Sequence, residues 1–317
     1  MTRFGYFLAS EENGPRELVR QARGAEEAGF SALWISDHFH PWLDEQGHSP
    51  FVWSVIGALG EATSLPVTTA VTCPIMRIHP VITAQAAATA ACQLHGGLTF
   101  GVGTGEALNE HVVAERWPSA EERREMLEEA VGLIRELWSG RLTSHRGRHY
   151  QVDTARLYTL PDRPPPVFVS AFGTGSARLA GRIGDGLITM GTAPTVIEEF
   201  RDHGGSGKPI QSGLKVCWGP DRNEAREYAR RRWPNDALPG EAAQLLPLPR
   251  HFAQLAELVT TERVAAQMPC GPDPDEYLTA ISEYVEAGVD EVYISNIGRD
   301  QDGFFEFYAT EILPALA

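Results

Sequence analysis

The sequence has few cysteines, and their placement excludes two kinds of small protein. Only four occur in 317 residues, and none stands in a Cys-x-x-Cys pair or at metal-ligand spacing with the histidines. A disulfide framework and a zinc module are therefore excluded. Free thiols in a reducing compartment are expected, which favours a cytoplasmic protein with no bound metal.

Basic residues are scarce relative to acidic ones. The chain carries 27 Lys and Arg against 42 Asp and Glu, a formal net charge of -15. Nucleic-acid grooves and anionic membrane surfaces require positive charge, so neither kind of partner is expected. No apolar run approaches a membrane span, and the first ten residues are too short in their apolar part for a signal peptide. We therefore expect a small-molecule partner.

Two common catalytic signatures are missing as well. The chain has no Gly-x-Ser-x-Gly elbow and no Walker phosphate loop, which disfavours hydrolases and nucleotide triphosphatases. It also has no internal repeat and no low-complexity tract.

What the chain does have is a regular alternation of short apolar runs and stretches of helical periodicity. The expected strands are Phe4–Leu8, Ala32–Ile35, Val67–Val71, Leu98–Val102, Val167–Ser170, Gly186–Thr189, Leu214–Trp218 and Glu291–Ser295. The expected helices include Pro15–Ala28, Val52–Ala62, Val81–Leu94, Ala120–Trp138 and Ser176–Arg182.

Eight strands alternating with helices predict an α/β fold, the (β/α)8 TIM barrel, built as a single domain over residues 1–317 with insertion segments. Gly140–Leu160 is expected to form a small excursion with a hairpin. Residues 219–275 fit no barrel element, and within them Leu238–Leu248 resembles an inserted loop or short helices over the barrel mouth.

The first candidate site segment is Ser-Asp-His-Phe-His-Pro-Trp, which directly follows the second expected strand. Parallel barrels build their sites at the carboxyl ends of strands, and a carboxylate beside an imidazole moves protons near neutral pH. Asp37, His38 and Trp42 are therefore candidates. The alternative is structural, with Asp37 capping a turn and His38 an ordinary loop histidine.

The second candidate segment is Gly-Val-Gly-Thr-Gly-Glu-Ala-Leu-Asn-Glu at 101–110, which completes the fourth expected strand. Alternating glycines allow a flat ligand to approach the backbone closely. The segment is not a dinucleotide fingerprint, because it follows the wrong strand and lacks the Gly-x-Gly-x-x-Gly spacing. A plain turn explains one or two glycines, but the polar residues that follow favour a functional loop.

A third, weaker candidate is the loop from Phe172 to Ser176, which joins the fifth expected strand to a helix. The backbone N–H groups at a helix N-terminus suit a phosphate, although structural turns of this composition are common.

At these motifs the chain resembles the bacterial-luciferase-like superfamily, in the branch that uses the deazaflavin coenzyme F420. Ser36–Trp42 and Gly103–Glu110 are similar to the signature segments of F420-dependent glucose-6-phosphate dehydrogenases. The resemblance extends over nearly the whole chain, including Gly181–Gly186 and Ala287–Val289. It implies a (β/α)8 barrel and an F420-dependent dehydrogenase or reductase that transfers hydride between coenzyme F420 and an alcohol or carbonyl carbon.

The resemblance also implies roles for individual residues. His38 takes the substrate hydroxyl proton, Trp42 helps to hold the developing charge, and Glu106 supplies a proton to the ring. A non-prolyl cis peptide is implied at Ala70–Val71. The residues implied to bind the coenzyme are Asp37, Ala70, Val71, Thr104, Gly105, Asn109, Phe172, Gly173, Thr174, Gly175 and Ser176.

One departure concerns the substrate. A near-ungapped alignment places the three basic residues that hold the sugar phosphate in these dehydrogenases at Glu199, Ala266 and Asp290. Two carboxylates there repel a phosphate, which favours an unphosphorylated substrate unless Lys208, Lys215 or Arg263 replaces the lost charge.

Several alternatives remain open at this level. The chain is alternatively an FMN-dependent monooxygenase of the same superfamily or a non-catalytic F420-binding relative. The resemblance implies a homodimer, for which Val52–Ala62 and Val81–Leu94 offer small and apolar residues, although these helices equally fit ordinary barrel packing. Substrate identity and reaction direction are not determined by the sequence.

Overall fold

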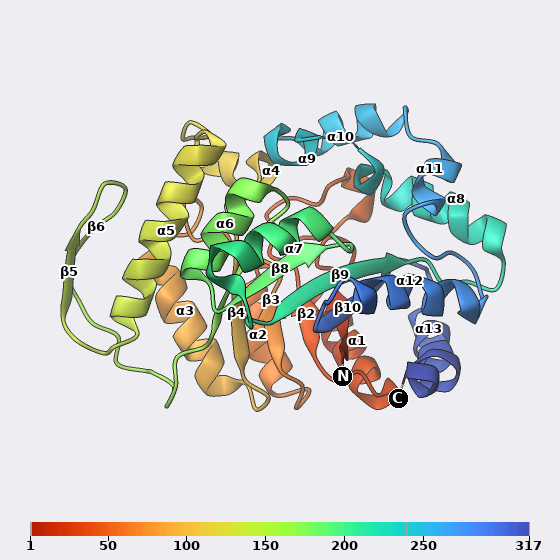
Figure 1. Ribbon diagram of the computed structural model, residues 1–317, viewed down its shortest axis with the longest axis horizontal. Coiled ribbons are helices and arrows are strands. Elements are labelled where there is room, and N and C mark those ends of the chain that lie inside the picture. The colour runs from red at the N-terminus through yellow and green to blue at the C-terminus, as the bar shows by residue number, and fades with distance from the viewer. Residues whose placement is uncertain (1, 239, 317) are drawn as a thin grey trace.

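The computed structural model describes residues 2–238 and 240–316 and confirms the predicted barrel. Eight parallel strands close in the order β1-β10-β9-β8-β7-β4-β3-β2 (Figure 1). They are β1 (Arg3–Leu8), β2 (Leu33–Ile35), β3 (Val67–Thr69), β4 (Leu98–Val102), β7 (Val167–Ser170), β8 (Gly186–Met190), β9 (Ile210–Val216) and β10 (Glu291–Asn296).

Helices cover the outside of this barrel. The covering helices are α1 (Pro15–Ala28), α2 (Val52–Gly60), α3 (Pro80–Gln93), α5 (Ala120–Leu137), α6 (Thr174–Ile183), α7 (Pro194–Phe200), α12 (Pro274–Glu286) and α13 (Gln301–Phe307). Single turns and 3-10 or π segments occupy Asp44–Gln46, His111–Val113, Arg201–Gly205, Pro234–Ala237, Tyr308–Ile312 and Leu313–Leu316.

The predicted excursion is an antiparallel hairpin, which lies beside α5 at the left edge of Figure 1. Its strands are β5 (Thr143–Arg146) and β6 (Gln151–Ala155). The unassigned region 219–275 supplies a group of helices at the carboxyl end of the barrel, namely α8 (Arg222–Arg232), α9 (Ala242–Leu245), α10 (Pro249–Ala256) and α11 (Thr261–Ala265). Part of the expected segment 238–248 is thus helical, and residue 239 lies outside the described residues. The short helix α4 (Ala107–Glu110) follows β4.

An aromatic layer inside the barrel forms the floor of the mouth. Trp34 of β2 stacks on Tyr293 of β10 with ring centroids 4.4 Å apart, and its Nε1 donates to Gln211 of β9 at 2.9 Å. Gly213 makes room for this layer, since a Cβ there would lie 2.4 Å from the sulfur of Met190. The barrel is therefore filled below this level and open above it.

One strand prediction was displaced. The seventh strand was expected at Leu214–Trp218, whereas β9 begins four residues earlier, at Ile210. Its first half contains Gln211, Ser212 and Gly213, which break the apolar pattern of a buried strand. Gln211 is nevertheless buried, because Trp34, Glu291 and Tyr293 satisfy its amide inside the barrel.

Candidate active site at the carboxyl ends of the strands

A cavity of about 550 Å³ opens at the carboxyl ends of the barrel strands and gathers all but one of the residues predicted to be catalytic or to bind the coenzyme. Trp42 does not line it, but its ring lies 5.1 Å from the ring of His38, centroid to centroid. The predicted residues that line the cavity are Asp37, His38, Ala70, Val71, Thr104, Gly105, Glu106, Asn109, Phe172, Gly173, Thr174, Gly175 and Ser176.

The inner part of the cavity is shaped for a flat ligand. The peptide bond between Ala70 and Val71 is cis, as the resemblance implied. Gly103 lies directly behind this step, and a Cβ at Gly103 would come within 2.8 Å of Val71 Cγ2. Gly105 has φ 72°, and a Cβ there would lie 2.5 Å from the sulfur of Cys73. The glycines are thus required for the β4 loop to pack against the β3 loop.

His38 lies at the centre of the polar groups in the cavity. Its Nε2 is 3.4 Å from Glu11 Oε1 and 3.7 Å from Glu106 Oε2. Its Nδ1 is 3.1 Å from the carbonyl oxygen of His40 and 3.2 Å from the amide nitrogen of Asn109. The Asn109 amide is itself oriented, because its oxygen accepts from the backbone N–H of Phe39 at 2.9 Å. Each face of the imidazole therefore has defined partners.

Glu11 is the functional candidate that the sequence reasoning missed. It is buried, and Ser36 donates to its Oε2 at 2.7 Å. It follows β1 by only a few residues, so the rule that selected the ends of β2 and β4 also applied here. No distinctive motif marks this position in the sequence, because Glu11 stands in an ordinary acidic stretch, Ser-Glu-Glu-Asn.

Glu106 is the second carboxylate near Nε2 of His38, at 3.7 Å, beside Glu11. Burial raises the pKa of Glu106, and this effect exceeds the opposing attraction of His38. The Asn109 amide donates to Glu106 Oε2 at 3.0 Å. A carboxyl group whose pKa is raised by burial is better suited to donate a proton.

A buried charge network supports the cavity from behind. Arg77 donates to Asp37 Oδ1 at 2.8 Å, while Thr72 donates to Asp37 Oδ2 at 2.8 Å. The backbone N–H of Arg77 donates to Glu110 at 2.7 Å, and burial raises the pKa of Glu110 to about 7. Arg77 thus joins the loops that follow β2 and β4.

At the mouth, a lysine on β9 is already neutralised. The ammonium of Lys215 is 2.8 Å from Asp236 Oδ2 and 4.1 Å from the ring centroid of Trp233. The charge of Lys215 slightly offsets the rise that burial causes in the pKa of Glu106.

The expected alignment of a phosphate subsite at Glu199, Ala266 and Asp290 was wrong. Glu199 lies on α7 outside the barrel and pairs with Arg178 at 2.8 Å. Asp290 precedes β10 at the amino end of the barrel, where it accepts from the N–H of Ile210. Ala266 follows α11 on another face. These three residues therefore do not converge on one subsite.

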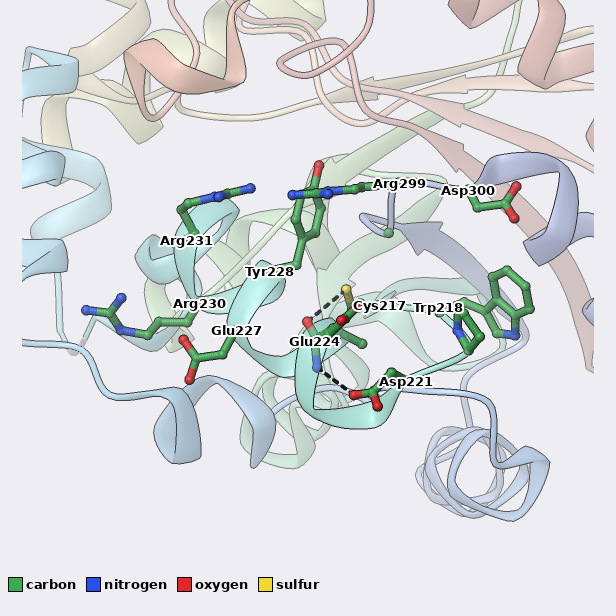
Figure 2. A pocket seen from close by; sticks show the side chains of 14 residues that line it. Cys217, Trp218, Asp221, Glu224, Glu227, Tyr228, Arg230, Arg231, Arg299 and Asp300 are labelled. Carbon is green, nitrogen blue, oxygen red and sulfur yellow. Dashed lines mark hydrogen bonds between the residues drawn. The ribbon is translucent and has the colours of Figure 1, made fainter.

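A second cavity of about 490 Å³ contains none of the predicted site residues. It lies between α8 and the loops after β9 and β10, as Figure 2 shows. The Tyr228 ring there lies near two guanidinium groups, those of Arg231 at 5.3 Å and Arg299 at 4.8 Å. Asp221 caps the N-terminus of α8 with its own carboxylate (Figure 2).

Residues 2–238 and 240–316 form neither a metal site nor a membrane-spanning helix. No group of three His, Cys, Asp or Glu side chains is arranged to hold a metal ion. None of the helices there combines the length and apolar character needed to cross a membrane.

The fold and the cavity define a class: a (β/α)8-barrel protein whose ligand site combines a flat inner slot with an imidazole set between two carboxylates. The sequence profile of the luciferase-like monooxygenase family matches residues 1–291. The chain belongs to this family.

Three named proteins resemble this chain over nearly their full lengths. An F420-dependent glucose-6-phosphate dehydrogenase of Microbacterium testaceum is 36% identical over 99% of this chain and 97% of its own. A solved F420-dependent secondary alcohol dehydrogenase, in complex with an F420-acetone adduct, is 33% identical, covers 100% of this chain and 99% of its own, and has a TM-score of 0.93. The F420-dependent tetrahydromethanopterin reductase of Methanopyrus kandleri, 20% identical with a TM-score of 0.82 over 100% of this chain and 99% of its own, shares the fold.

Proposed function

We propose that this protein is an F420-dependent oxidoreductase that transfers hydride between the coenzyme and an alcohol or carbonyl carbon of a small, unphosphorylated substrate. The observation that carries the proposal is the convergence of His38, Glu106 and the cis Ala70–Val71 step on one cavity. Full-length relatives that are 33% and 36% identical are F420-dependent dehydrogenases, which supports the same chemistry.

The cavity fits the coenzyme at both ends. Its inner part is lined by Phe7, Trp34 and Ile188 and by the Ala70–Val71 step, which suit an apolar, planar ring. Its outer part is lined by residues 172–176. Gly173 is the N-cap residue of α6, so no side chain caps this helix. Free N–H groups at a helix N-terminus are suited to a phosphate.

In the oxidation direction, His38 acts as the base. Nδ1 faces an acceptor, the carbonyl of His40, and a donor, the amide of Asn109. This geometry permits the tautomer with the proton on Nδ1, in which Nε2 takes the proton of the substrate hydroxyl. Glu11 lies 3.4 Å from that nitrogen and stabilises the imidazolium that forms. The bound coenzyme supplies the ring carbon that accepts the hydride.

Glu106 and Trp42 complete the arrangement. Glu106 has a raised pKa and supplies a proton on the ring side, next to Asn109. Trp42 packs edge-on against Phe252 at 5.2 Å and holds its indole beside His38, where it limits water access and supports the developing charge. In the reduction direction the proton transfers are reversed: His38 gives its proton to the substrate oxygen, and Glu106 accepts a proton from the ring side.

The charges near His38 favour a substrate without a phosphate group. Glu11 and Glu106 lie within 4 Å of its Nε2. The lysine at this end of the barrel, Lys215, is already paired with Asp236. An anionic group placed among these carboxylates is repelled, whereas a neutral hydroxyl or carbonyl is not.

We expect the substrate preference to follow this charge distribution. With saturating F420, a neutral secondary alcohol such as 2-propanol should have a kcat/KM at least about 100-fold above that of glucose 6-phosphate, since like-charge juxtaposition costs several kcal/mol. Steady-state loss of deazaflavin absorbance measures both. Equal or better turnover of the sugar phosphate would reject the unphosphorylated substrate and keep the coenzyme assignment.

A cytoplasmic homodimer is part of the same proposal. The four cysteines are free, which suits a reducing compartment. Phe51 at the start of α2 and Ile82 on α3 are about half exposed, at 52% and 54%, on the helices expected to form the interface. We expect Ile82→Glu to shift the protein from dimer to monomer in sedimentation velocity, and a wild-type monomer would contradict the proposal.

A further inference from the structure

The outer part of the active-site cavity holds two adjacent arginines that the proposed chemistry does not use. Arg123 and Arg124 lie in the first turns of α5 and line the same cavity as residues 174–176. Neither forms an ion pair with a carboxylate among residues 2–238 and 240–316. This is unusual in a chain with a net charge of -15.

Arg123 is buried without an ion-pair partner among residues 2–238 and 240–316, although Glu241 lines the same cavity. It is only 3% exposed, its Nη1 donates to the carbonyl of Pro118 at 2.7 Å, and its guanidinium lies 4.2 Å from the ring centroid of Trp117. Its Nε has no hydrogen-bond partner within the part of the chain that the structure describes. A buried guanidinium with an unused donor is costly unless an anion joins it, and burial accordingly lowers the pKa of Arg123.

Arg124 lies against the first turn of α6. Its guanidinium atoms are 3.1 to 3.3 Å from the point where a Cβ on Gly175 would stand, so glycine leaves the space that the guanidinium occupies. This turn begins at Gly173 with no side-chain cap and contains no acidic residue. A cation beside the positive end of a helix dipole is unfavourable unless a negative group lies between them.

The second cavity shows the opposite arrangement. There Asp221 satisfies the N-terminus of α8, and Glu224 and Glu227 offset the arginines along the lining (Figure 2). The positive charge beside α6 is therefore local to the coenzyme cavity.

We propose that Arg123 and Arg124 form a carboxylate-binding subsite for the acidic chain of the coenzyme, next to the α6 turn that takes its phosphodiester. The inference rests on the proposed coenzyme. Beyond its ring, F420 continues through a phosphodiester into a chain of glutamates, so one ligand carries both anionic groups in sequence. Two guanidinium groups offer paired donors that match a carboxylate.

The test compares the affinity of three ligands: F420 with its glutamate chain, the phospholactyl form without glutamates, and the ring with its ribityl group alone. Binding is followed by quenching of deazaflavin fluorescence, without turnover. We expect Arg124→Gln to weaken the glutamate-bearing form about tenfold and the form without glutamates by less than about twofold. In the wild type, added salt should weaken the first form more steeply than the second.

Arg182→Gln is the matched control. It removes the same charge from α6, but Arg182 lies at the far end of that helix and pairs with Glu128. Its affinities should match those of the wild type. Arg124→Glu, which keeps the buried Arg123 in place, should weaken the glutamate-bearing form further than Arg124→Gln.

Two results would overturn the subsite. Equal weakening of both phosphorylated forms would place Arg124 on the phosphodiester alone, and unchanged affinities would remove it from the coenzyme. Either result leaves tight wild-type binding of F420 intact. Failure of the wild type to bind any of the three ligands would instead reject the coenzyme assignment.

Discussion

Replacing His38 by alanine is expected to lower kcat by about 1,000-fold, within the range for the loss of a general base. The affinity for the coenzyme should change by less than about twofold, because the cavity is lined by many other groups. The physical reason is that Nε2 of His38 is the nitrogen left free to take the substrate proton, while Glu11 and Glu106 are placed around it. Stopped-flow reduction of bound F420 measures the step directly.

His40→Ala provides the matched control. His40 belongs to the same loop, but it does not line the cavity, and its Nδ1 lies 2.9 Å from the carbonyl of Leu108. The backbone carbonyl that orients His38 is kept in this variant. We expect its hydride-transfer rate to stay within about fivefold of the wild type. A His38→Ala enzyme that reduces F420 at the wild-type rate would remove His38 from proton transfer.

The second large effect is expected on stability. Arg77→Met should lower the free energy of unfolding by about 3 to 5 kcal/mol at pH 8, the usual cost of removing one partner from a buried ion pair. The substitution leaves the carboxylates of Asp37 and Glu110 buried without their cation. Urea unfolding followed by tryptophan fluorescence measures the loss.

The loss should depend on pH in a defined direction. The pKa of Glu110 is raised to about 7, so the native state binds its proton more tightly than the unfolded state does. Such a group stabilises the fold at low pH, and its contribution declines as pH rises toward 7. Without the charge of Arg77, which lowers it in the wild type, the pKa of Glu110 should rise further. The difference between Arg77→Met and the wild type should therefore be smaller at pH 5 than at pH 8.

Arg116→Met serves as the control for this experiment. Arg116 also pairs with a carboxylate, Glu122, but its side chain is 71% exposed. Exposed pairs contribute less than about 1 kcal/mol, so this variant should unfold almost like the wild type. An equal loss in both variants, or none at Arg77, would show that the buried network does not stabilise the loops around the cavity.

Much of the site could be predicted because of how parallel barrels are built. The residues after the second and fourth strands, Asp37 to Trp42 and Gly103 to Glu110, share one end of the sheet. Identifying those strands in the sequence is therefore enough to predict that the two motifs lie close together. The loop after β7, residues 172–176, lies at the same end of the sheet for the same reason.

The prediction failed for residues that do not directly follow a barrel strand, because the sequence alone does not then show where they lie in space. Glu199 and Asp290 were assigned to one subsite, but they lie on an outer helix and at the amino end of the barrel. Region 219–275 could not be assigned because the Arg-rich α8 lacks a strong apolar pattern and the helices α9 and α11 are very short. Their placement depends on the barrel they pack against.

By itself, the sequence determined the closed eight-stranded sheet, the end at which the site lies and the residue types that line it, because strand periodicity and strand direction are local properties. Tertiary structure alone decided which groups meet. It set Glu11 beside His38, joined Arg77 to Asp37 and Glu110, and laid Arg124 against Gly175. These contacts join loops and helices far apart in the chain, and only closure of the barrel brings such groups within reach of one another.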